Sequence, residues 1–238
     1  MPVLIYTFKD SMKNFAGKNL LVFGDSIMNG SGNSDIGVGE YLKNKYGFNL
    51  AKYCVGGARV GFCKDKNWVV EQVRKAILNK EAADLIVFNG FTNDCCISDG
   101  SELCDVPLGE IVKEGVDIFA ITEQMNFSEC FDSIASAFKK YFAGAGVVFV
   151  RPHKMGRRGA DVQIAYGERA KEICKKYGIS VADIYEDSGL DTFDAVQRDK
   201  YTADTYGWGR GDCTHPNALG YTEKYMPLIE KEIIKIFG

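Results

Sequence analysis

Five short apolar runs recur along the chain, and helical patterns separate them. Each run is rich in β-branched or aromatic residues and has the length of a strand buried in a sheet. The runs cover residues 20–23, 50–55, 85–88, 147–150 and 179–184. Because strands that alternate with helices normally run parallel, the pattern predicts a parallel sheet with helices on both faces.

The segments between these runs repeat apolar residues every three or four positions, as amphipathic helices do. In segment 127–142, for example, Phe127, Phe131 and Phe138 fall on one face of a helix. The predicted helices cover residues 38–46, 68–78, 127–142, 160–177 and 218–237. No internal repeat or proline-rich linker divides the sequence, so we expect a single domain over residues 1–238.

Two stretches, 95–123 and 187–212, do not fit this alternation of strands and helices. Both are rich in turn residues, and each follows the end of a predicted strand. Loops that follow parallel strands lie at the carboxyl edge of a sheet, where open α/β folds carry their ligand sites. We therefore expect both stretches at that edge.

Composition and charge narrow the range of partners. The 238 residues are 46% hydrophobic and 26% charged, which is ordinary usage for a globular protein with a sizeable core. The formal net charge is −3 and no basic block occurs, so neither nucleic acid nor a membrane surface is expected as a partner. The sequence leaves the oligomeric state open.

The expected compartment follows from segments that the sequence lacks. The N-terminal residues have neither the basic region nor the long apolar core of a signal peptide, and no apolar run reaches the ~18 residues of a membrane span. The eight cysteines show no C-x-x-C spacing, which indicates reduced thiols rather than a disulfide framework. We expect a cytoplasmic protein, unless a signal peptide was removed from the sequence.

The first candidate for chemistry is the string Gly24-Asp25-Ser26, directly after the apolar run 20–23. A turn at a strand end can present a serine hydroxyl and direct backbone N–H groups at an incoming oxygen. The same string also suits a plain strand-to-helix turn in which Ser26 is the N-cap. Taken alone, it is too short and too common to decide between the two.

The second candidate lies just before the last predicted helix. Asp212 and His215 are three positions apart, so a compact turn can bring their side chains together. The carboxylate can then accept a hydrogen bond from Nδ1–H, which selects the tautomer and stabilises the imidazolium formed during proton transfer. The alternative is a surface histidine in a turn, which is weakened because the chain has only two histidines.

Four blocks occur in the order that the SGNH/GDSL hydrolase family shows. They are Gly24-Asp25-Ser26, Gly56-Gly57 after the second predicted strand, Asn93-Asp94 after the third, and Asp212-x-x-His215 before the last helix. The chain therefore resembles this family over nearly its whole length, and the strings HPNALGY and VPLGEI are similar to those of bacterial members. The resemblance implies a three-layer α/β/α sandwich around a five-stranded parallel sheet, flavodoxin-like in topology.

The family's roles carry over to the matching positions. Ser26 matches the nucleophile, His215 the general base and Asp212 the residue that orients the base. The Ser26 N–H, the Gly57 N–H and the Asn93 side-chain amide match the oxyanion-hole donors, each typically worth about 3–4 kcal/mol of barrier. From the residues alone, Gly57 also suits a plain turn and Asn93 a turn cap. No cofactor or metal is implied.

The third block departs from the family pattern, which usually reads Gly-x-Asn-Asp. Phe91 stands where the glycine is expected, which puts the path of the loop and the size of the acyl pocket in question. We expect the carboxylates of Asp25 and Asp94 to hold loops by accepting backbone N–H bonds rather than to take part in the chemistry.

Residues outside the four blocks carry weaker signals. Arg151 and His153 follow the fourth apolar run, and we expect them to be solvated loop residues rather than substrate contacts. The aromatic residues Tyr201, Tyr206 and Trp208 suit either a platform for a sugar or packing of the long loop, and packing is the preferred interpretation.

The resemblance implies hydrolysis of a carboxylic ester through an acyl-enzyme on Ser26. A small-acyl, above all acetyl, ester of a carbohydrate or other small molecule is the first choice by analogy. The alternatives are a lysophospholipase or thioesterase acting on longer acyl chains, a non-catalytic binding protein, and a flavodoxin-like phosphate-binding module. Since a histidine base must be neutral to accept a proton, activity should fall in acid.

Overall fold

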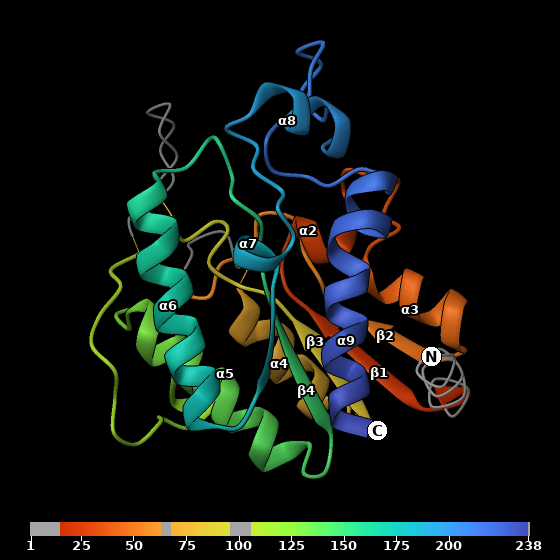
Figure 1. The fold of residues 1–238 in the computed structure, drawn as a ribbon. Coiled ribbons are helices and arrows are strands. Elements are labelled where there is room, and N and C mark those ends of the chain that lie inside the picture. Colours follow the sequence, from red (N-terminus) through yellow and green to blue (C-terminus); the bar gives the residue numbers. More distant parts are fainter. Residues whose placement is uncertain (1–14, 63–67, 96–105, 238) are drawn as a thin grey trace, which may run out of the picture.

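A computed structural model describes residues 15–62, 68–95 and 106–237 of the chain. Five parallel strands form one sheet in the order β2-β1-β3-β4-β5 (Figure 1). They are β1 (Asn19–Phe23), β2 (Asn49–Lys52), β3 (Leu85–Phe88), β4 (Gly146–Arg151) and β5 (Ser180–Asp183). Each overlaps one of the five apolar runs, so the predicted parallel sheet is confirmed.

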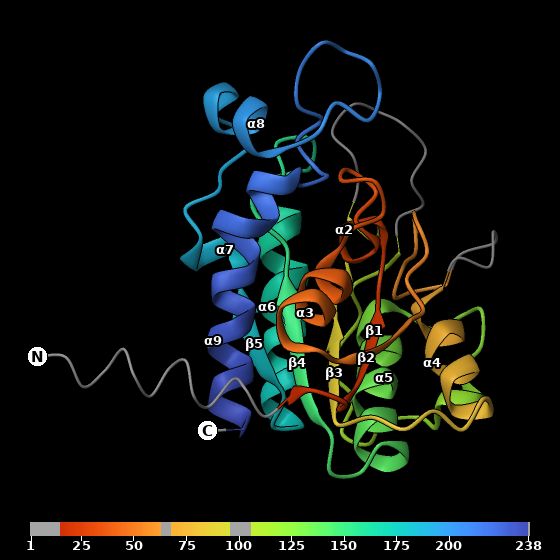
Figure 2. The ribbon, with the colours of Figure 1, turned by 90° about the vertical axis from the view of Figure 1, so that its right-hand side faces the viewer.

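Helices cover both faces of the sheet (Figures 1 and 2). One face carries α3 (Val38–Tyr46) and α9 (Met226–Phe237), and the other carries α4 (Val69–Leu78), α5 (Phe127–Tyr141) and α6 (Ala160–Lys176). Shorter elements are α2 (Ser26–Asn29), the 3₁₀ turn η2 (Ile118–Ala120), α7 (Ile184–Asp187), α8 (Ala195–Tyr201) and the π-helical turn η3 (Gly220–Tyr225). The three layers of the predicted α/β/α sandwich are therefore present. In the part of the chain that the structure describes, no helix has the length and apolar composition needed to cross a membrane.

The core alternates between the two faces of each strand, because successive side chains of a strand point to opposite sides. On β1, Val22 faces α3, where Gly39 leaves room for it. The next residue, Phe23, points to the other face and stacks on Phe138 of α5 with ring centres 5.5 Å apart. All four residues of β3 are buried, as expected of a central strand covered on both sides.

The first stretch that lacked periodicity does not stay at the carboxyl edge. Residues 106–123 of this stretch run down along α5 and return (Figure 1). Lys176, at the lower end of α6, donates to the Val112 carbonyl at 3.1 Å, and Arg74 of α4 donates to the Ile118 carbonyl at 2.8 Å. The expectation for this stretch is therefore only partly right. Its residues 96–105 lie outside the described part of the chain.

The second stretch does lie beyond the carboxyl ends of the strands, but it contains a helix that the sequence did not predict. This helix, α8, begins after Asp194, whose side chain accepts from the Val196 N–H at 2.8 Å. The last predicted helix, 218–237, is also not one continuous α-helix, because the π-helical turn η3 precedes α9.

Candidate active site

Ser26 lies at the carboxyl end of β1, where the strand order of the sheet reverses. From β1 the chain connects first to β2 on one side and then to β3 on the other, and open α/β folds bind ligands in the crevice at such a point. Ser26 is the first residue of α2, directly after the turn that ends β1. The N-cap is Asp25, whose carboxylate accepts from the Ile27 N–H at 2.8 Å, so Ser26 is not needed as a cap.

Two buried side chains hold the turn before Ser26. Gln72 of α4 accepts from the Gly24 N–H at 2.8 Å and donates to the Gly24 carbonyl at 2.9 Å. Asn89, just after β3, accepts from the Asp25 N–H at 3.1 Å and donates to the Asp25 carboxylate at 2.9 Å. A Cβ at Gly24 would lie 2.0 Å from Asn89 Oδ1, and φ there is 137°, so only glycine fits.

Neither Gln72 nor Asn89 belongs to the blocks that the sequence indicated as functional. The available signal was a polar residue within a buried pattern: Gln72 lies on the apolar face of α4 beside Val69 and Val73. A buried polar side chain needs partners, so such a residue indicates a specific hydrogen-bonding duty.

The structure brings Ser26, His215 and Asp212 together. Ser26 Oγ lies 2.9 Å from His215 Nε2, although the two residues are 189 positions apart. His215 Nδ1 lies 2.7 Å from Asp212 Oδ2, and Thr205 donates a hydrogen bond to the same oxygen. An ionised carboxylate accepts from Nδ1–H, which leaves Nε2 free to accept the serine proton.

The Asp212 carboxylate is buried but fully partnered. Its second oxygen, Oδ1, accepts the backbone N–H groups of Thr214 and His215, each at 2.8 Å. Burial acts to raise the pKa of Asp212, but the His215 side chain and these hydrogen bonds outweigh it and lower the pKa to about 2. Asp212 therefore stays ionised at neutral pH and can orient the imidazole.

The two other predicted blocks lie against the nucleophile turn. The Val55 N–H donates to the Gly24 carbonyl at 3.0 Å, which places the turn containing Gly57 beside the end of β1. Asn93 Nδ2 donates to the Ala58 carbonyl at 2.9 Å, so the third block is joined to the second. The Asn93 amide has two N–H groups, and this bond uses one of them.

Asp25 and Asp94 make the backbone hydrogen bonds that were predicted for them. Asp94 accepts the N–H groups of Val60 and Gly61, with the shorter bond 2.8 Å long. Burial raises the pKa of Asp94 to about 6, against the lowering effect of those bonds. Asp94 thus links the loop after β3 to the loop after β2.

Comparison with known proteins decides the family. The family model described as GDSL-like Lipase/Acylhydrolase family matches residues 22–222. The chain belongs to this family. Membership implies an ester hydrolase, and the predicted resemblance is confirmed. No curated protein matches the chain.

Solved structures share the fold of this GDSL-like chain at low sequence identity. A protein from Lactobacillus plantarum has a TM-score of 0.65 at 18% identity, over 92% of this chain and 96% of that one. A catalytic mutant of an acetylxylan esterase from Geobacillus stearothermophilus has a TM-score of 0.56 at 15% identity, over 95% and 96%. A phospholipase A1 from Streptomyces albidoflavus NA297 has a TM-score of 0.53 at 16% identity, over 91% and 100%.

Arg158 is a third residue of the site that the sequence pattern did not single out. Its guanidinium is buried and donates to the Thr92 carbonyl and, at 3.1 Å, to Thr214 Oγ1. It therefore ties the Asn93 loop to the Asp212–His215 turn of the GDSL-like site. Burial lowers the pKa of Arg158. The string Arg157-Arg158 carries no signal that separates a buried arginine from a surface one.

An exposed aromatic pair forms the rim of the site beside His215. The rings of Tyr206 and Trp208 stack with centres 4.7 Å apart, and the Tyr206 ring centre lies 6.4 Å from that of His215. Tyr206 is 52% exposed and Trp208 45%, whereas Tyr201 is buried. The Arg157 guanidinium lies 4.8 Å from the Trp208 ring centre. Packing is thus confirmed for Tyr201, but Tyr206 and Trp208 face solvent.

The expectation that Arg151 and His153 are solvated loop residues is wrong. Arg151 is buried and pairs with Glu168 at 2.9 Å and Asp183 at 3.1 Å. His153 is buried behind the Asp212–His215 turn, where it contacts the backbone of Cys213. Neither residue reaches solvent, because β4 extends to Arg151 and the loops that follow cover its end.

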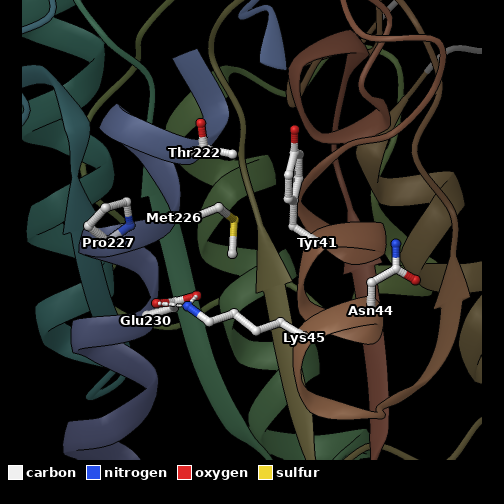
Figure 3. A pocket seen from close by; sticks show the side chains of 7 residues that line it. All are labelled: Tyr41, Asn44, Lys45, Thr222, Met226, Pro227 and Glu230. Carbon is white, nitrogen blue, oxygen red and sulfur yellow. Dashed lines mark hydrogen bonds and ion pairs between the residues drawn. The ribbon is translucent and has the colours of Figure 1, made fainter. Parts of the chain in front are cut away.

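A cavity of about 480 Å³ lies away from the catalytic side chains, between α3 and the start of α9. Tyr41 and Met226 face each other across it, and the Lys45–Glu230 ion pair closes one end (Figure 3). Ser26 is not among its lining residues. Within residues 15–62, 68–95 and 106–237, no group of three or more His, Cys, Asp or Glu side chains is placed to hold a metal ion.

Phe91 occupies the position in the third block where the family usually has glycine. Its backbone φ is 72°, in the left-handed region that glycine favours, and its side chain is buried near Phe149. The loop therefore keeps the backbone conformation that a glycine would give. The strain costs roughly 1–2 kcal/mol, and burial of the phenyl ring offsets it.

We expect Phe91→Gly to lower the free energy of unfolding by about 2–4 kcal/mol, because the cavity left by the ring outweighs the relief of strain. Chemical denaturation measures this. The matched control is Lys80→Gly, since Lys80 is exposed with φ 55°, and this change should be neutral or slightly stabilising. A Phe91→Gly variant more stable than the wild type would contradict the role assigned to the ring.

Proposed function

We propose that this chain is a serine esterase in which Ser26 attacks an ester carbonyl and forms an acyl-enzyme. The observation that carries the proposal is the 2.9 Å hydrogen bond between Ser26 Oγ and His215 Nε2. His215 takes the serine proton during attack and returns it to the leaving alcohol, and a water molecule then hydrolyses the acyl-enzyme by the reverse sequence of proton transfers. Asp212 orients His215 and stabilises the imidazolium.

The negative charge that develops on the carbonyl oxygen needs donors that are already in place. The proposed donors are the backbone N–H groups of Ser26 and Gly57 and the Asn93 side-chain amide. Support comes from the bonds that hold them: Asp25 caps α2, and Asn93 is anchored on the Ala58 carbonyl. Donors fixed before the reaction need no reorganisation in the transition state.

The proposed substrate is a small-acyl ester, above all an acetyl ester, of a carbohydrate or similar small molecule. The leaving alcohol must lie near His215 Nε2, which protonates it, and the exposed rings of Tyr206 and Trp208 lie on that side. Flat aromatic surfaces suit the apolar faces of sugar rings. One of the similar structures, from Geobacillus stearothermophilus, is an acetylxylan esterase. An ester of a longer acyl chain is the alternative, with the phospholipase A1 as its analogue.

Replacement of the proposed nucleophile tests the reaction class. We expect Ser26→Ala to lower kcat/KM for p-nitrophenyl acetate by at least about 10³-fold and to abolish labelling by a fluorophosphonate probe, because no acyl-enzyme can form. The matched control is Ser31→Ala, just after α2, whose exposed hydroxyl accepts from the Asn29 side chain over a long distance of 3.4 Å. A wild type that neither reacts with the probe nor hydrolyses any ester of the panel would indicate a binding protein instead.

The pH dependence tests the base. The pKa of Asp212 is lowered to about 2 by its bonds with His215, in spite of burial, and burial lowers that of buried His153 to about 4. Both groups therefore keep their charge state between about pH 5 and 8. We expect kcat/KM to fall as the pH decreases, because a histidine base must be neutral to accept the serine proton, and a flat profile between about pH 5 and 8 would contradict the role of His215.

Asp94 titrates within the same window, because burial raises its pKa to about 6. The Asp94→Asn variant is therefore the control for this experiment. It should keep the fall in kcat/KM at acid pH if a group other than Asp94 causes that fall.

The aromatic rim tests the substrate class. We expect Tyr206→Ala and Trp208→Ala to raise KM for acetylated oligosaccharides about tenfold and to change KM for p-nitrophenyl acetate much less, because one stacked ring contributes about 1 kcal/mol or more. Phe119→Ala is the control, since Phe119 is similarly exposed on η2, away from the site. Equal effects on both substrates, or a preference for octanoate and palmitate esters, would favour the longer-chain alternative.

A further inference from the structure

The π-helical turn η3 (Gly220–Tyr225) presents two tyrosines to the interior behind the active site. Tyr221 and Tyr225 are both fully buried, with ring centres 5.8 Å apart. A π-helical turn holds one more residue than an α-helical turn, which makes it uncommon, and such turns are frequent at functional sites. The proposed catalytic pair is Ser26 and His215. The Tyr221 hydroxyl contacts the helix that carries Ser26, and the Tyr225 hydroxyl contacts His153, which lies behind the turn of His215.

Tyr221 holds the nucleophile helix. Its hydroxyl donates to the Ile27 carbonyl at 2.5 Å, next to Ser26 in the sequence. Helix α2 has only four residues, so it cannot hold its own position through internal hydrogen bonds alone. The hydrogen bond from Tyr221 helps to fix the position of α2.

Tyr225 reaches the other half through His153. The Tyr225 hydroxyl lies 2.7 Å from His153 Nδ1 and 3.3 Å from the His153 backbone nitrogen. A carbonyl can only accept, so Nε2 carries the ring proton and donates to the Cys213 carbonyl at 3.2 Å. In the neutral ring Nδ1 is then an acceptor, and it accepts from the Tyr225 hydroxyl, whose oxygen accepts the His153 backbone N–H.

Cys213 lies in the turn between Asp212 and His215, and its φ is 67°. Such a backbone conformation is unfavourable for a residue other than glycine and needs outside support. Two hydrogen bonds provide this support: the Cys213 carbonyl accepts from His153 and, at 2.9 Å, from Thr192 Oγ1. Burial lowers the pKa of His153 to about 4, so the ring is neutral and keeps one donor and one acceptor.

We propose that the π-helical turn is the positioning element of the catalytic pair, with Tyr221 fixing the helix of Ser26 and the chain Tyr225–His153–Cys213 fixing the turn of Asp212 and His215. This inference rests on the proposed serine esterase function. Tyr221, Tyr225 and His153 are fully buried and act through the residues they hold, so they are positioning residues. Loss of one link should lower kcat and leave KM nearly unchanged, because a small shift of the base affects the reaction more than binding.

The test compares two replacements of His153 on p-nitrophenyl acetate. His153→Leu removes the donor to the Cys213 carbonyl, and we expect kcat to fall about tenfold or more with KM within about twofold. His153→Gln keeps an N–H donor, and kcat should stay within about threefold of the wild type. Equal losses in both variants, or losses that only follow their melting temperatures, would overturn the proposal.

Tyr225→Phe completes a double-mutant cycle with His153→Leu. Alone it should lower kcat several-fold, and in the His153→Leu background it should change kcat by less than about twofold, because the hydroxyl acts through His153. Additive losses of kcat would overturn the proposed path from Tyr225 through His153 to Cys213. Tyr177→Phe is the control: its hydroxyl donates to Asp132 at 2.8 Å near the end of α6, and its loss should not change kcat.

Nitrogen NMR of the wild type tests the hydrogen bonds of His153. It needs neither an activity measurement nor a folded variant. The sequence has only two histidines, so the imidazole signals are few. We expect the buried histidine to show the Nε2–H tautomer in a slowly exchanging form. The Nδ1–H tautomer would overturn the proposal whether or not the protein hydrolyses esters, whereas a wild type without esterase activity would overturn only the proposed function.

Discussion

A single hydrogen bond, between Ser26 Oγ and His215 Nε2, joins two loops that lie 189 positions apart in the chain. It can form only while both loop backbones are held in place. The sheet brings the loops to the same edge, but buried polar side chains set their positions. Gln72 and Asn89 hold the turn before Ser26, and Arg158 joins the Asn93 loop to the turn of His215.

A network of this kind is stable only when its members are paired, since an unpaired buried donor or acceptor costs about 1–3 kcal/mol. Two unfavourable backbone conformations also lie beside the site. Phe91 and Cys213 both have positive φ, and each is compensated locally. The ring of Phe91 is buried in the core, and the Cys213 carbonyl accepts two hydrogen bonds. Strain of this kind persists where the surroundings determine the backbone position.

The exposed rim is connected to the buried network. Thr205 donates to the Asp212 carboxylate, and the next residue, Tyr206, stacks on Trp208. Asp204 caps the same loop by accepting the Trp208 N–H at 2.7 Å. The aromatic pair is therefore held relative to His215, so a ligand that stacks on it meets a prearranged surface at a lower entropic cost.

The sequence alone determined the strands, the main helices and the four blocks that define the family. Buried parallel strands read as continuous apolar runs, and amphipathic helices repeat their apolar positions, so both patterns are local. Helix α3 has the predicted bounds, because Gly47 ends it in the left-handed conformation. Helix α8 escaped prediction because it has little apolar face, with Val196 exposed. The π-helical turn escaped because one extra residue per turn leaves almost no trace in the pattern.

Only the tertiary structure decided which polar residues are buried and what they hold. Arg151 and His153 were expected to be solvated loop residues, and nothing in the sequence singled out Arg158, yet all three are buried among partners from distant parts of the chain. The physical reason is that the burial of a polar group depends on its hydrogen-bond partners, and those partners are brought near by the fold rather than by neighbours in the sequence.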